Sequence, residues 1–259
     1  MINSPNNSQV KHLVQLLKKA KLRKEEQSFI VEGRKMFLEA EGLRIKSYIS
    51  ESYLVQYPET LELLKDEPYE IVTDSIMQVI SDTKTPQGIV TVVRMPEYSL
   101  TEVFEKEESR LIFLESLRDP GNLGTIVRTA EGAGIRGVIL NKESVDIYNP
   151  KVVRSTMGAI FRMPVIYVDD FYGTLRQAKA AGFELYAAHL KGTEFYDDVE
   201  YAKKTGVLIG NESAGLSEQA AEEATKLVKI PMEGQVESLN AAIAATVFMY
   251  EIYRQWRKS

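Results

Sequence analysis

The sequence contains no cysteine and only two histidines, His12 and His189, in 259 residues. The absence of cysteine excludes a disulfide framework, a thiolate nucleophile and a zinc or iron–sulfur site held by cysteine. Two histidines also exclude a metal site built from several imidazoles, so we expect no metal cofactor. A chain of this composition is consistent with a cytoplasmic protein.

The sequence also lacks a long hydrophobic run. The first ten residues, MINSPNNSQV, contain no apolar segment of the kind that a secretory signal needs. The most apolar long stretch, residues 239–250, is interrupted by Asn240 and Thr246. A membrane span needs ~20 apolar residues, so we expect a soluble protein with no membrane partner. Apolar residues make up 44% of the chain and charged residues 27%, which is ordinary globular usage and excludes extensive disorder.

The net charge of −5 conceals an asymmetry along the chain. Residues 1–36 carry eight Lys or Arg side chains and three Glu, a net charge of +5, whereas the remainder carries 24 basic and 34 acidic side chains, a net charge of −10. A basic patch on an acidic protein is typical of a surface that contacts a phosphate backbone. The alternative is a solvated helix face, and charge alone slightly favours that alternative.

The first 97 residues predict a small α/β domain. Residues 8–24 have apolar residues at helical spacing, with lysines mostly on the other side. Short β-rich runs follow at residues 29–31, 45–49, 70–72 and 88–93, with helices expected at 34–41 and 75–80. Pro96 and the polar residues after it end the last strand, so we expect a linker over residues 98–107.

Residues 108–259 alternate between strand and helix more clearly. Apolar runs predict strands at residues 111–114, 137–140, 164–168, 184–187, 206–209 and 227–230. Helices are expected at 123–133, 170–181 and 217–224, and a long final helix from about residue 238 to Lys258. Near-continuous Val, Ile and Leu strands separated by helices indicate a mostly parallel sheet covered by helices on both faces.

In such sheets, ligands bind outside the carboxyl ends of the strands, so the loops there are the places to look for function. The loop after residues 111–114 contains Gly121, Asn122 and Gly124, and it leads into the helix that carries Arg128. On spacing alone, Asn122 is interpreted as a helix cap and Arg128 as a solvated side chain. The loop has neither the G-x-G-x-x-G pattern of a dinucleotide site nor a Walker A motif, which disfavours ATP or GTP hydrolysis.

The loop after residues 206–209 contains Gly210, Glu212 and Gly215. Backbone amides in a glycine-rich turn can bind the polar edge of a ligand, and a carboxylate there can accept hydrogen bonds. The alternative is an ordinary strand-to-helix turn with Ser217 as the N-cap of the next helix, and the residues favour both interpretations equally.

The loop after residues 227–230 leads to the final helix. Ser238 is expected to cap that helix, and Asn240 is expected in its first turn, where a polar side chain in an apolar helix suggests a specific partner. His189 follows another strand at the same edge of the sheet. It is interpreted as a structural or solvent-facing residue, with a place in a cofactor pocket as the alternative.

Taken together and in order, these loops resemble the three motifs of the SPOUT class of RNA methyltransferases, in its SpoU/TrmH branch. The matching segments are DPGNLGTIVRTA at residues 119–130, IGNESAGLS at 209–217 and IPMEGQVESLN at 230–240. The resemblance covers residues 108–259. It departs from the usual motifs at Ser213, where glycine is common, and at the Ala-Ala pair after Asn240. The run FIVEG at residues 29–33, after the basic helix, more weakly resembles the ribosomal-protein-like substrate-binding domain of many rRNA-modifying members.

The resemblance implies a fold and a reaction. It implies a deep trefoil knot in the C-terminal sheet, which forms a pocket for S-adenosylmethionine, and a homodimer with the active site near the dimer interface. The implied reaction is methyl transfer to a ribose 2′-hydroxyl of RNA. The two-domain layout favours ribosomal RNA over transfer RNA as the substrate.

The resemblance also assigns residues by motif position. The implied catalytic set is Asn122, Arg128, Glu212, Ser238 and Asn240. The implied cofactor-binding set is Gly210, Ile230 and Leu239, with Leu208, Ile209, Met232 and His189 lining the pocket. In this context the basic residues of the N-terminal segment become candidates for binding RNA, namely Lys18, Lys19, Lys21, Arg23, Lys24 and Arg34.

Three functional hypotheses follow from the sequence. The leading one is an S-adenosylmethionine-dependent RNA 2′-O-methyltransferase acting on ribosomal RNA, with transfer RNA as an alternative substrate. A non-catalytic protein for RNA binding or ribosome assembly is the second, and the intact set of polar motif residues disfavours it. A nucleotide-dependent oxidoreductase is the third, and the missing G-x-G-x-x-G pattern disfavours it.

Overall fold

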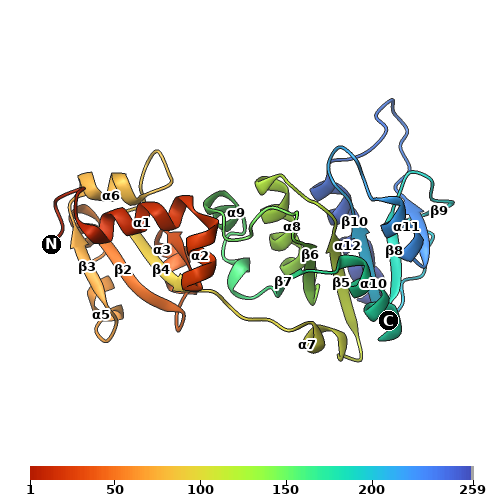
Figure 1. Ribbon diagram of the computed structural model, residues 1–259, viewed down its shortest axis with the longest axis horizontal. Helices are drawn as coiled ribbons and strands as arrows, with labels where there is room; N and C mark the ends of the chain where they lie inside the picture. Colours follow the sequence, from red (N-terminus) through yellow and green to blue (C-terminus); the bar gives the residue numbers. More distant parts are fainter. Residues whose placement is uncertain (258–259) are drawn as a thin grey trace. The chain divides into compact units, whose positions relative to one another are not determined.

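The computed structural model describes residues 1–257 and divides the chain into two compact units (Figure 1). Unit 1 comprises Met1–Glu97 and Tyr148–Phe161, and unit 2 comprises Tyr98–Ile147 and Arg162–Ser259. Lys258, expected at the end of the final helix, lies outside the described residues. Within the described part of the chain, no helix is both long and apolar enough to cross a membrane.

Unit 1 is built on a four-stranded sheet in the order β1-β4-β2-β3. Strands β1 (Ser28–Glu32) and β2 (Arg44–Ser50) run antiparallel to β4 (Ile89–Arg94), and β3 (Tyr69–Val72) runs parallel to β2. The apolar side chains of α1 (Ser8–Lys18) and α6 (Asp74–Ile80) pack together with this sheet into one core. Unit 1 also contains α3 (Arg34–Glu39), α4 (Glu51–Gln56), α5 (Thr60–Leu63) and α9 (Pro150–Ser155).

The single helix expected over residues 8–24 is wrong, because the structure has two helices there. Helix α1 (Ser8–Lys18) ends at Lys19, whose backbone is extended, and α2 (Ala20–Glu26) follows. Arg23 is buried, and its guanidinium donates hydrogen bonds to the carbonyl oxygens of Leu16 (2.8 Å) and Leu17 (3.0 Å). These carbonyls lie in the last turn of α1, where no further turn of helix supplies N–H donors. The guanidinium therefore stabilises the break and is not an exposed charge for RNA, which corrects the expectation for Arg23.

Residues 148–161 pack with unit 1, although the sequence pattern included them in the expected 108–259 domain. The ring of Tyr148 lies 4.7 Å from that of Phe29 between centroids, and α9 contacts β1. This contact joins segments more than a hundred residues apart, which a pattern of local periodicity does not reveal. The expected roles of the two domains stay predictions.

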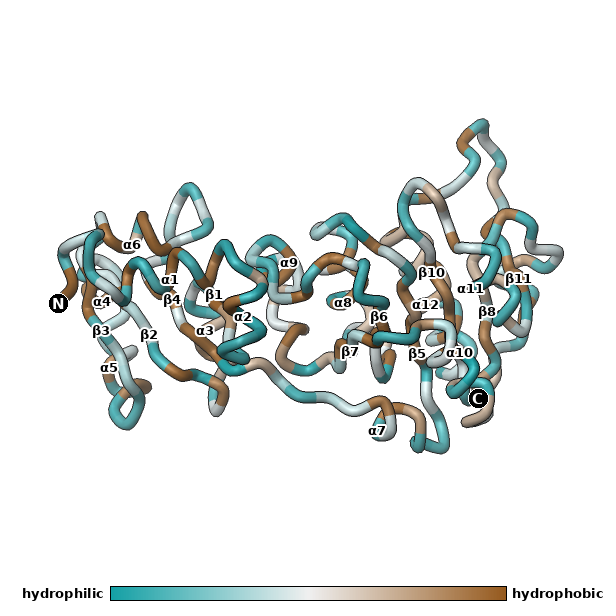
Figure 2. The backbone as a smooth tube through the Cα atoms, in the orientation of Figure 1, coloured by the Kyte–Doolittle hydropathy of each residue, from teal (hydrophilic) through white to brown (hydrophobic). Residues whose placement is uncertain are grey.

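Unit 2 contains a seven-stranded sheet in the order β7-β6-β5-β10-β8-β11-β9, and every pair of neighbours is parallel. The central strands are continuous apolar runs, which suits a sheet covered on both faces (Figure 2). The predicted parallel α/β fold is confirmed, while the trefoil knot stays a prediction. The strands are β5 (Ser109–Leu114), β6 (Gly137–Asn141), β7 (Val165–Val168), β8 (Glu184–Ala188), β9 (Glu194–Phe195), β10 (Lys204–Ile209) and β11 (Lys226–Lys229).

Helices cover this sheet and leave its carboxyl edge to the loops. Helix α12 (Ala241–Trp256) packs against α8 (Pro120–Gly132) and β10. On the other face, α10 (Phe171–Ala180) and α11 (Glu218–Glu223) contact β8, and α7 (Leu100–Phe104) precedes β5. Because all the strands are parallel, the loops that follow β5, β10 and β11 emerge at the same edge of the sheet.

Candidate active site

The loops after β5, β10 and β11 are joined by one asparagine side chain. Asn122, in the first turn of α8, donates from Nδ2 to Oε1 of Glu212 (3.0 Å). Its Oδ1 accepts a hydrogen bond from Nδ2 of Asn240 (2.9 Å). The two partners are 90 and 118 residues away in sequence. We call Asn122, Glu212 and Asn240 the polar junction.

Two of the expected helix caps are wrong. The residues that cap these helices in the structure explain how the side chains of Asn122 and Asn240 can bond to each other. Helix α8 is capped by Asp119, whose Oδ1 accepts from the backbone N–H of Asn122 (2.8 Å), so the Asn122 side chain is free to bridge loops. Helix α12 is capped by Asn240 instead of Ser238: its Oδ1 accepts from the N–H of Ala242 (2.9 Å). The specific partner expected for Asn240 is Asn122. The expected cap at Ser217 is confirmed, since its Oγ accepts from the N–H of Ala220 (3.1 Å).

The Glu212 carboxylate is held by donors from a different loop. Besides the amide of Asn122, it accepts hydrogen bonds from the backbone N–H groups of Asp119 (3.0 Å) and Arg118 (3.3 Å). Burial raises the pKa of this carboxyl group, but the bonds from Asn122 and from the backbone outweigh burial and leave the pKa below its usual range. Glu212 is therefore ionised at neutral pH and acts as a hydrogen-bond acceptor, not as a general acid.

The loop between β5 and α8 is fixed by residues that the sequence analysis missed. Ser116 has a φ of +54°, in the left-handed region that non-glycine residues seldom adopt. Its N–H donates to Oδ1 of Asn141 (2.8 Å), and its carbonyl accepts from Nδ2 of Asn211 (2.8 Å). Asn141 is the last residue of β6 and Asn211 follows β10. A polar residue at the carboxyl end of a buried strand is the signal that could have identified both.

A buried carboxylate fixes the other end of the Glu212 loop. Glu115, directly after β5, is only 5% exposed. It accepts hydrogen bonds from the N–H (2.8 Å) and Oγ (2.7 Å) of Ser217 and from the hydroxyl of Tyr172 (2.7 Å). Because two of these bonds come from the N-cap of α11 and the third comes from α10, Glu115 ties both helices to the end of β5.

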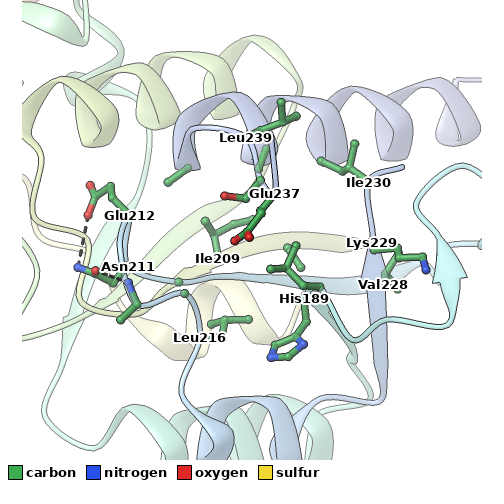
Figure 3. A pocket seen from close by; sticks show the side chains of 18 of the residues that line it. His189, Ile209, Asn211, Glu212, Leu216, Val228, Lys229, Ile230, Glu237 and Leu239 are labelled. Atoms are coloured by element: carbon green, nitrogen blue, oxygen red, sulfur yellow. Dashed lines mark hydrogen bonds between the residues drawn. The ribbon is translucent and has the colours of Figure 1, made fainter. Parts of the chain in front are cut away.

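A cavity of about 370 Å³ lies beside the polar junction (Figure 3). Its apolar wall includes Ile209, Leu216 and Val228, and the loops after β8, β10 and β11 close around it. The expected cofactor residues that line it are His189, Ile209, Gly210, Ile230, Met232 and Leu239; of the expected catalytic residues, Glu212 and Ser238 also line it.

Leu208 does not line the cavity, which corrects its expected position. Successive side chains of a strand point to opposite faces of a sheet. Ile209 reaches the cavity, whereas Leu208 is fully buried in the core with Phe113 and Leu185.

Gly210 is required by the shape of the Glu212 loop. A Cβ atom at this position would lie 2.1 Å from the carbonyl carbon of Gly215 and 2.2 Å from the nitrogen of Leu216. Because both atoms belong to the backbone, the loop cannot give way by rotating a side chain. The loop therefore folds back on itself closely enough to present backbone atoms to the cavity.

The cavity fits S-adenosylmethionine, the cofactor that the sequence resemblance implies. Its volume lies within the ~300–1,000 Å³ usual for sites of small molecules and cofactors. Its apolar wall suits an adenine ring. Glu237, which the sequence analysis missed, also lines the cavity and carries its carboxylate near Ile209 and Leu239 (Figure 3). A carboxylate there complements the positive charge of a sulfonium or an amino group. Among residues 1–257, no group of three or more His, Asp or Glu side chains is arranged to hold a metal ion.

Arg128 lies on α8 outside the lining of the cavity. Its side chain is exposed, and within residues 1–257 it makes no hydrogen bond or ion pair. On α12, which packs against α8, Ile243 and Tyr250 are 50% and 48% exposed. The guanidinium is thus available to a group that the isolated chain does not supply.

The remaining candidates for RNA binding lie in unit 1. Lys18, Lys19, Lys21 and Lys24 are exposed on α1 and α2 and at the turn between them. Arg34 differs from them, because it pairs with Glu59 (2.9 Å) and its guanidinium lies 4.7 Å from the centroid of the Tyr57 ring. We call these four exposed lysines the lysine surface.

Two family models match this chain. Residues 109–250 match the SpoU rRNA Methylase family, and residues 7–91 match an MRM3-like substrate binding domain.

Curated and solved relatives cover nearly the whole chain. The 23S rRNA (guanosine(2553)-2′-O)-methyltransferase RlmP of Bacillus subtilis is 30% identical, over 97% of this chain and 98% of the relative. The crystal structure of an AdoMet-bound rRNA methyltransferase from Sinorhizobium meliloti is 33% identical, with a TM-score of 0.86 over 98% of this chain and 97% of the other. The SpoU methyltransferase AviRb of Streptomyces viridochromogenes, in complex with AdoMet, has a TM-score of 0.89 at 28% identity, over 98% of this chain and all of the other.

Proposed function

This chain belongs to the SpoU rRNA methylase family, and we propose on that premise that it transfers a methyl group from S-adenosylmethionine to a ribose 2′-hydroxyl of ribosomal RNA. The observation that carries the proposal is the polar junction of Asn122, Glu212 and Asn240 beside a cavity of cofactor size. A module that only binds RNA has no need for three loops to converge in this way.

Different residues of the cavity bind different parts of the cofactor. When bound, S-adenosylmethionine supplies an activated methyl group on a positively charged sulfur. Ile209, Leu216 and Val228 provide the apolar wall, and the turn at Gly210 offers backbone groups. Glu237 adds a negative charge, which suits a cationic cofactor.

The polar junction, Ser238 and Arg128 position the ribose. Its hydroxyl must lose a proton as the new C–O bond forms, and it must be aligned with the methyl group. An arginine guanidinium carries a delocalised positive charge and a fork of N–H donors, so the role of Arg128 is to bind the target phosphate and to stabilise the developing negative charge on oxygen. Asn122 and Asn240 orient the ribose, with Ser238 beside them, and Glu212 fixes Asn122.

A homodimer would complete this site. Arg128 is exposed on α8, and the exposed apolar side chains Ile243 and Tyr250 lie on the neighbouring helix α12. Burying these side chains against a second copy would place Arg128 next to that copy. Light scattering on the wild type and on Ile243→Asp tests this: the wild type should be dimeric, and the variant should be monomeric and inactive. A monomeric and active wild type contradicts the dimer.

Ribosomal RNA is the substrate that the relatives favour. A curated relative that matches 97% of this chain is named for 23S rRNA. A ribosomal RNA substrate would be consistent with the cytoplasmic location that we propose for this enzyme. The lysine surface of unit 1 supports a role for residues 1–97 in selecting the RNA, because RNA recognition depends on phosphate contacts and shape. Transfer RNA is the alternative substrate, and comparing methyl transfer to the two RNAs separates them.

The decisive variant is Arg128→Ala, with Arg136→Ala as a matched control on an exposed arginine just beyond α8. We expect Arg128→Ala to lose ~100-fold or more in methyl transfer, the usual effect of removing a group that stabilises an oxyanion. Binding of S-adenosylmethionine, measured by calorimetry, should change less than about twofold, since Arg128 does not line the cavity. Substantial turnover by Arg128→Ala would defeat the assigned role.

A further inference from the structure

Unit 1 contains a second cavity, of about 140 Å³, that is separate from the cofactor cavity. Its walls come from the end of α1, from β1 and α3, from the loop after α6 and from α9. Leu17, Ile30, Met36 and Val153 supply apolar surface, while Glu32, Gln87 and Arg154 supply polar groups. An apolar cavity with a few fixed polar groups is the usual form of a ligand site.

The polar side of this cavity is fixed before any ligand binds. The carboxylate of Glu32 accepts hydrogen bonds from the hydroxyls of Ser81 (2.8 Å) and Thr83 (2.9 Å) and from the N–H of Gln87 (3.0 Å). The loop after α6 is therefore tied to the end of β1. This role accounts for the glutamate in the run FIVEG of residues 29–33.

The glycine of the same run places a free amide at the cavity. Gly33 has a φ of +95°, and a Cβ there would lie 2.2 Å from Oε1 of Gln87. The side-chain amide of Gln87 thus lies directly against Gly33. Within residues 1–257 this amide has no hydrogen-bond partner, so it offers an acceptor and two donors to a planar ligand.

The lining of the cavity also includes an exposed methionine in an unusual conformation. Met157 is 44% exposed and has a φ of +52°, a backbone region that non-glycine residues seldom adopt. Strained backbone that survives in a folded protein tends to lie at functional positions. The flexible thioether of methionine packs readily on the flat face of an aromatic ring.

The size and the charge around the cavity point to its ligand. A volume of 140 Å³ is well below the ~300–1,000 Å³ of sites for whole small molecules, and it suits a single planar ring system. Leu17 in the wall is followed directly by Lys18, the first residue of the lysine surface. A pocket for a ring therefore adjoins exposed cationic side chains, an arrangement that suits single-stranded RNA.

We propose that this cavity receives one unpaired nucleobase of the RNA substrate. Gln87 hydrogen-bonds the edge of the base, Met157 packs on its face, and the lysine surface holds the flanking phosphates. The pocket would let unit 1 choose RNA by an extruded base as well as by charge. This inference rests on the proposed function, because it takes the substrate to be RNA.

The test compares binding to two RNAs by full-length protein. The probes are an unmodified 23S rRNA transcript, which contains unpaired bases, and a fully paired RNA duplex, which does not. The variants are Gln87→Ala and Met157→Gly, and the matched controls are Gln56→Ala and Val55→Ala at exposed positions of α4 away from the cavity. Glycine accepts a positive φ, so Met157→Gly should unfold at no lower temperature than the wild type.

We expect both variants to bind the transcript about tenfold more weakly, as for the loss of one good contact to a base. Their binding to the duplex should match the wild type, and the controls should match it on both RNAs. Photo-crosslinking of a 4-thiouridine-labelled transcript should yield peptides that contain residues 81–87 or 150–157.

The possible results separate this inference from the proposed function. If the wild type methylates rRNA but both variants bind the transcript normally, the nucleobase pocket is refuted and the proposed function stands. Equal weakening on transcript and duplex also refutes the pocket, because it indicates a loss of phosphate contacts alone. If the wild type neither binds nor methylates rRNA, both proposals fail.

Discussion

Replacing Glu212 by glutamine changes the charge of the polar junction without changing its shape. In the wild type, Oε1 accepts from the N–H of Asp119 (3.0 Å) and the amide of Asn122 (3.0 Å). Oε2 accepts from the N–H of Arg118 (3.3 Å) and more distantly from the amide of Asn211 (3.4 Å). Glutamine keeps one acceptor oxygen, but its NH2 group replaces the other oxygen and faces N–H donors of the protein. One charge-assisted hydrogen bond is therefore replaced by a repulsive contact between two donors.

A hydrogen bond to a charged group contributes ~1.5–3 kcal/mol, and solvent screening of this exposed carboxylate reduces the figure to about 1–2 kcal/mol. If the junction orients Asn122 for the reaction, this cost lowers kcat by about 5- to 30-fold. The assay is transfer of a labelled methyl group to unmodified 23S rRNA, with cofactor affinity measured separately. Ser213→Ala, an exposed change in the same loop, is the control and should behave as the wild type. A fully active Glu212→Gln enzyme would refute the claim that the junction orients catalytic groups.

Five further outcomes are expected. Gly210→Ala should abolish cofactor binding in calorimetry, because its Cβ would lie 2.1 Å from the Gly215 backbone. Asn141→Ala should lower kcat more than cofactor affinity, since Ser116 loses the donor and acceptor that hold its positive φ; unchanged kcat would contradict this. Arg23→Ala should lower the free energy of unfolding by ~2–3 kcal/mol in urea titrations, because two carbonyls lose a charged donor. Lys24→Ala should leave stability within ~0.5 kcal/mol and reduce the salt dependence of RNA binding by about one counterion. The pKa of Glu212 is lowered in the folded protein, so its ionised form stabilises the fold above the unfolded pKa of ~4.3. This stabilisation is lost as the pH falls through the folded pKa. In thermal melts, acid should therefore destabilise Glu212→Gln less than the wild type.

The sequence predicted the parallel sheet of unit 2 well, because its strands are short apolar runs separated by amphipathic helices. Every strand expected there is present, and β9 is an addition of only two residues. Buried strands of this kind carry their signal in local composition. The N-terminal helix was harder to predict, since the helical periodicity of residues 8–24 runs through the break at Lys19. Only the tertiary bond from Arg23 to the end of α1 shows why the chain breaks there.

The sequence predicted which loops form the candidate site, but it did not predict the hydrogen bonds that join them. Asn122 and Asn240 stood out as polar residues in motif positions, but spacing assigned the caps to Asn122 and Ser238. The choice of cap depends on where each helix begins, and helix boundaries are the feature that a sequence predicts least precisely. Glu115 and Asn141 were missed because their partners lie 102 and 25 residues away, beyond any local pattern.

The most direct test of the central claim is methyl transfer from labelled S-adenosylmethionine to unmodified 23S rRNA, with transfer RNA alongside and Arg128→Ala as the inactive control. The account predicts label in the ribosomal RNA with the wild type only, at one nucleotide whose 3′ phosphodiester then resists alkaline cleavage, because a methylated 2′-oxygen cannot attack it. Label on a base with the backbone still cleavable, or equal label with Arg128→Ala, would contradict the account.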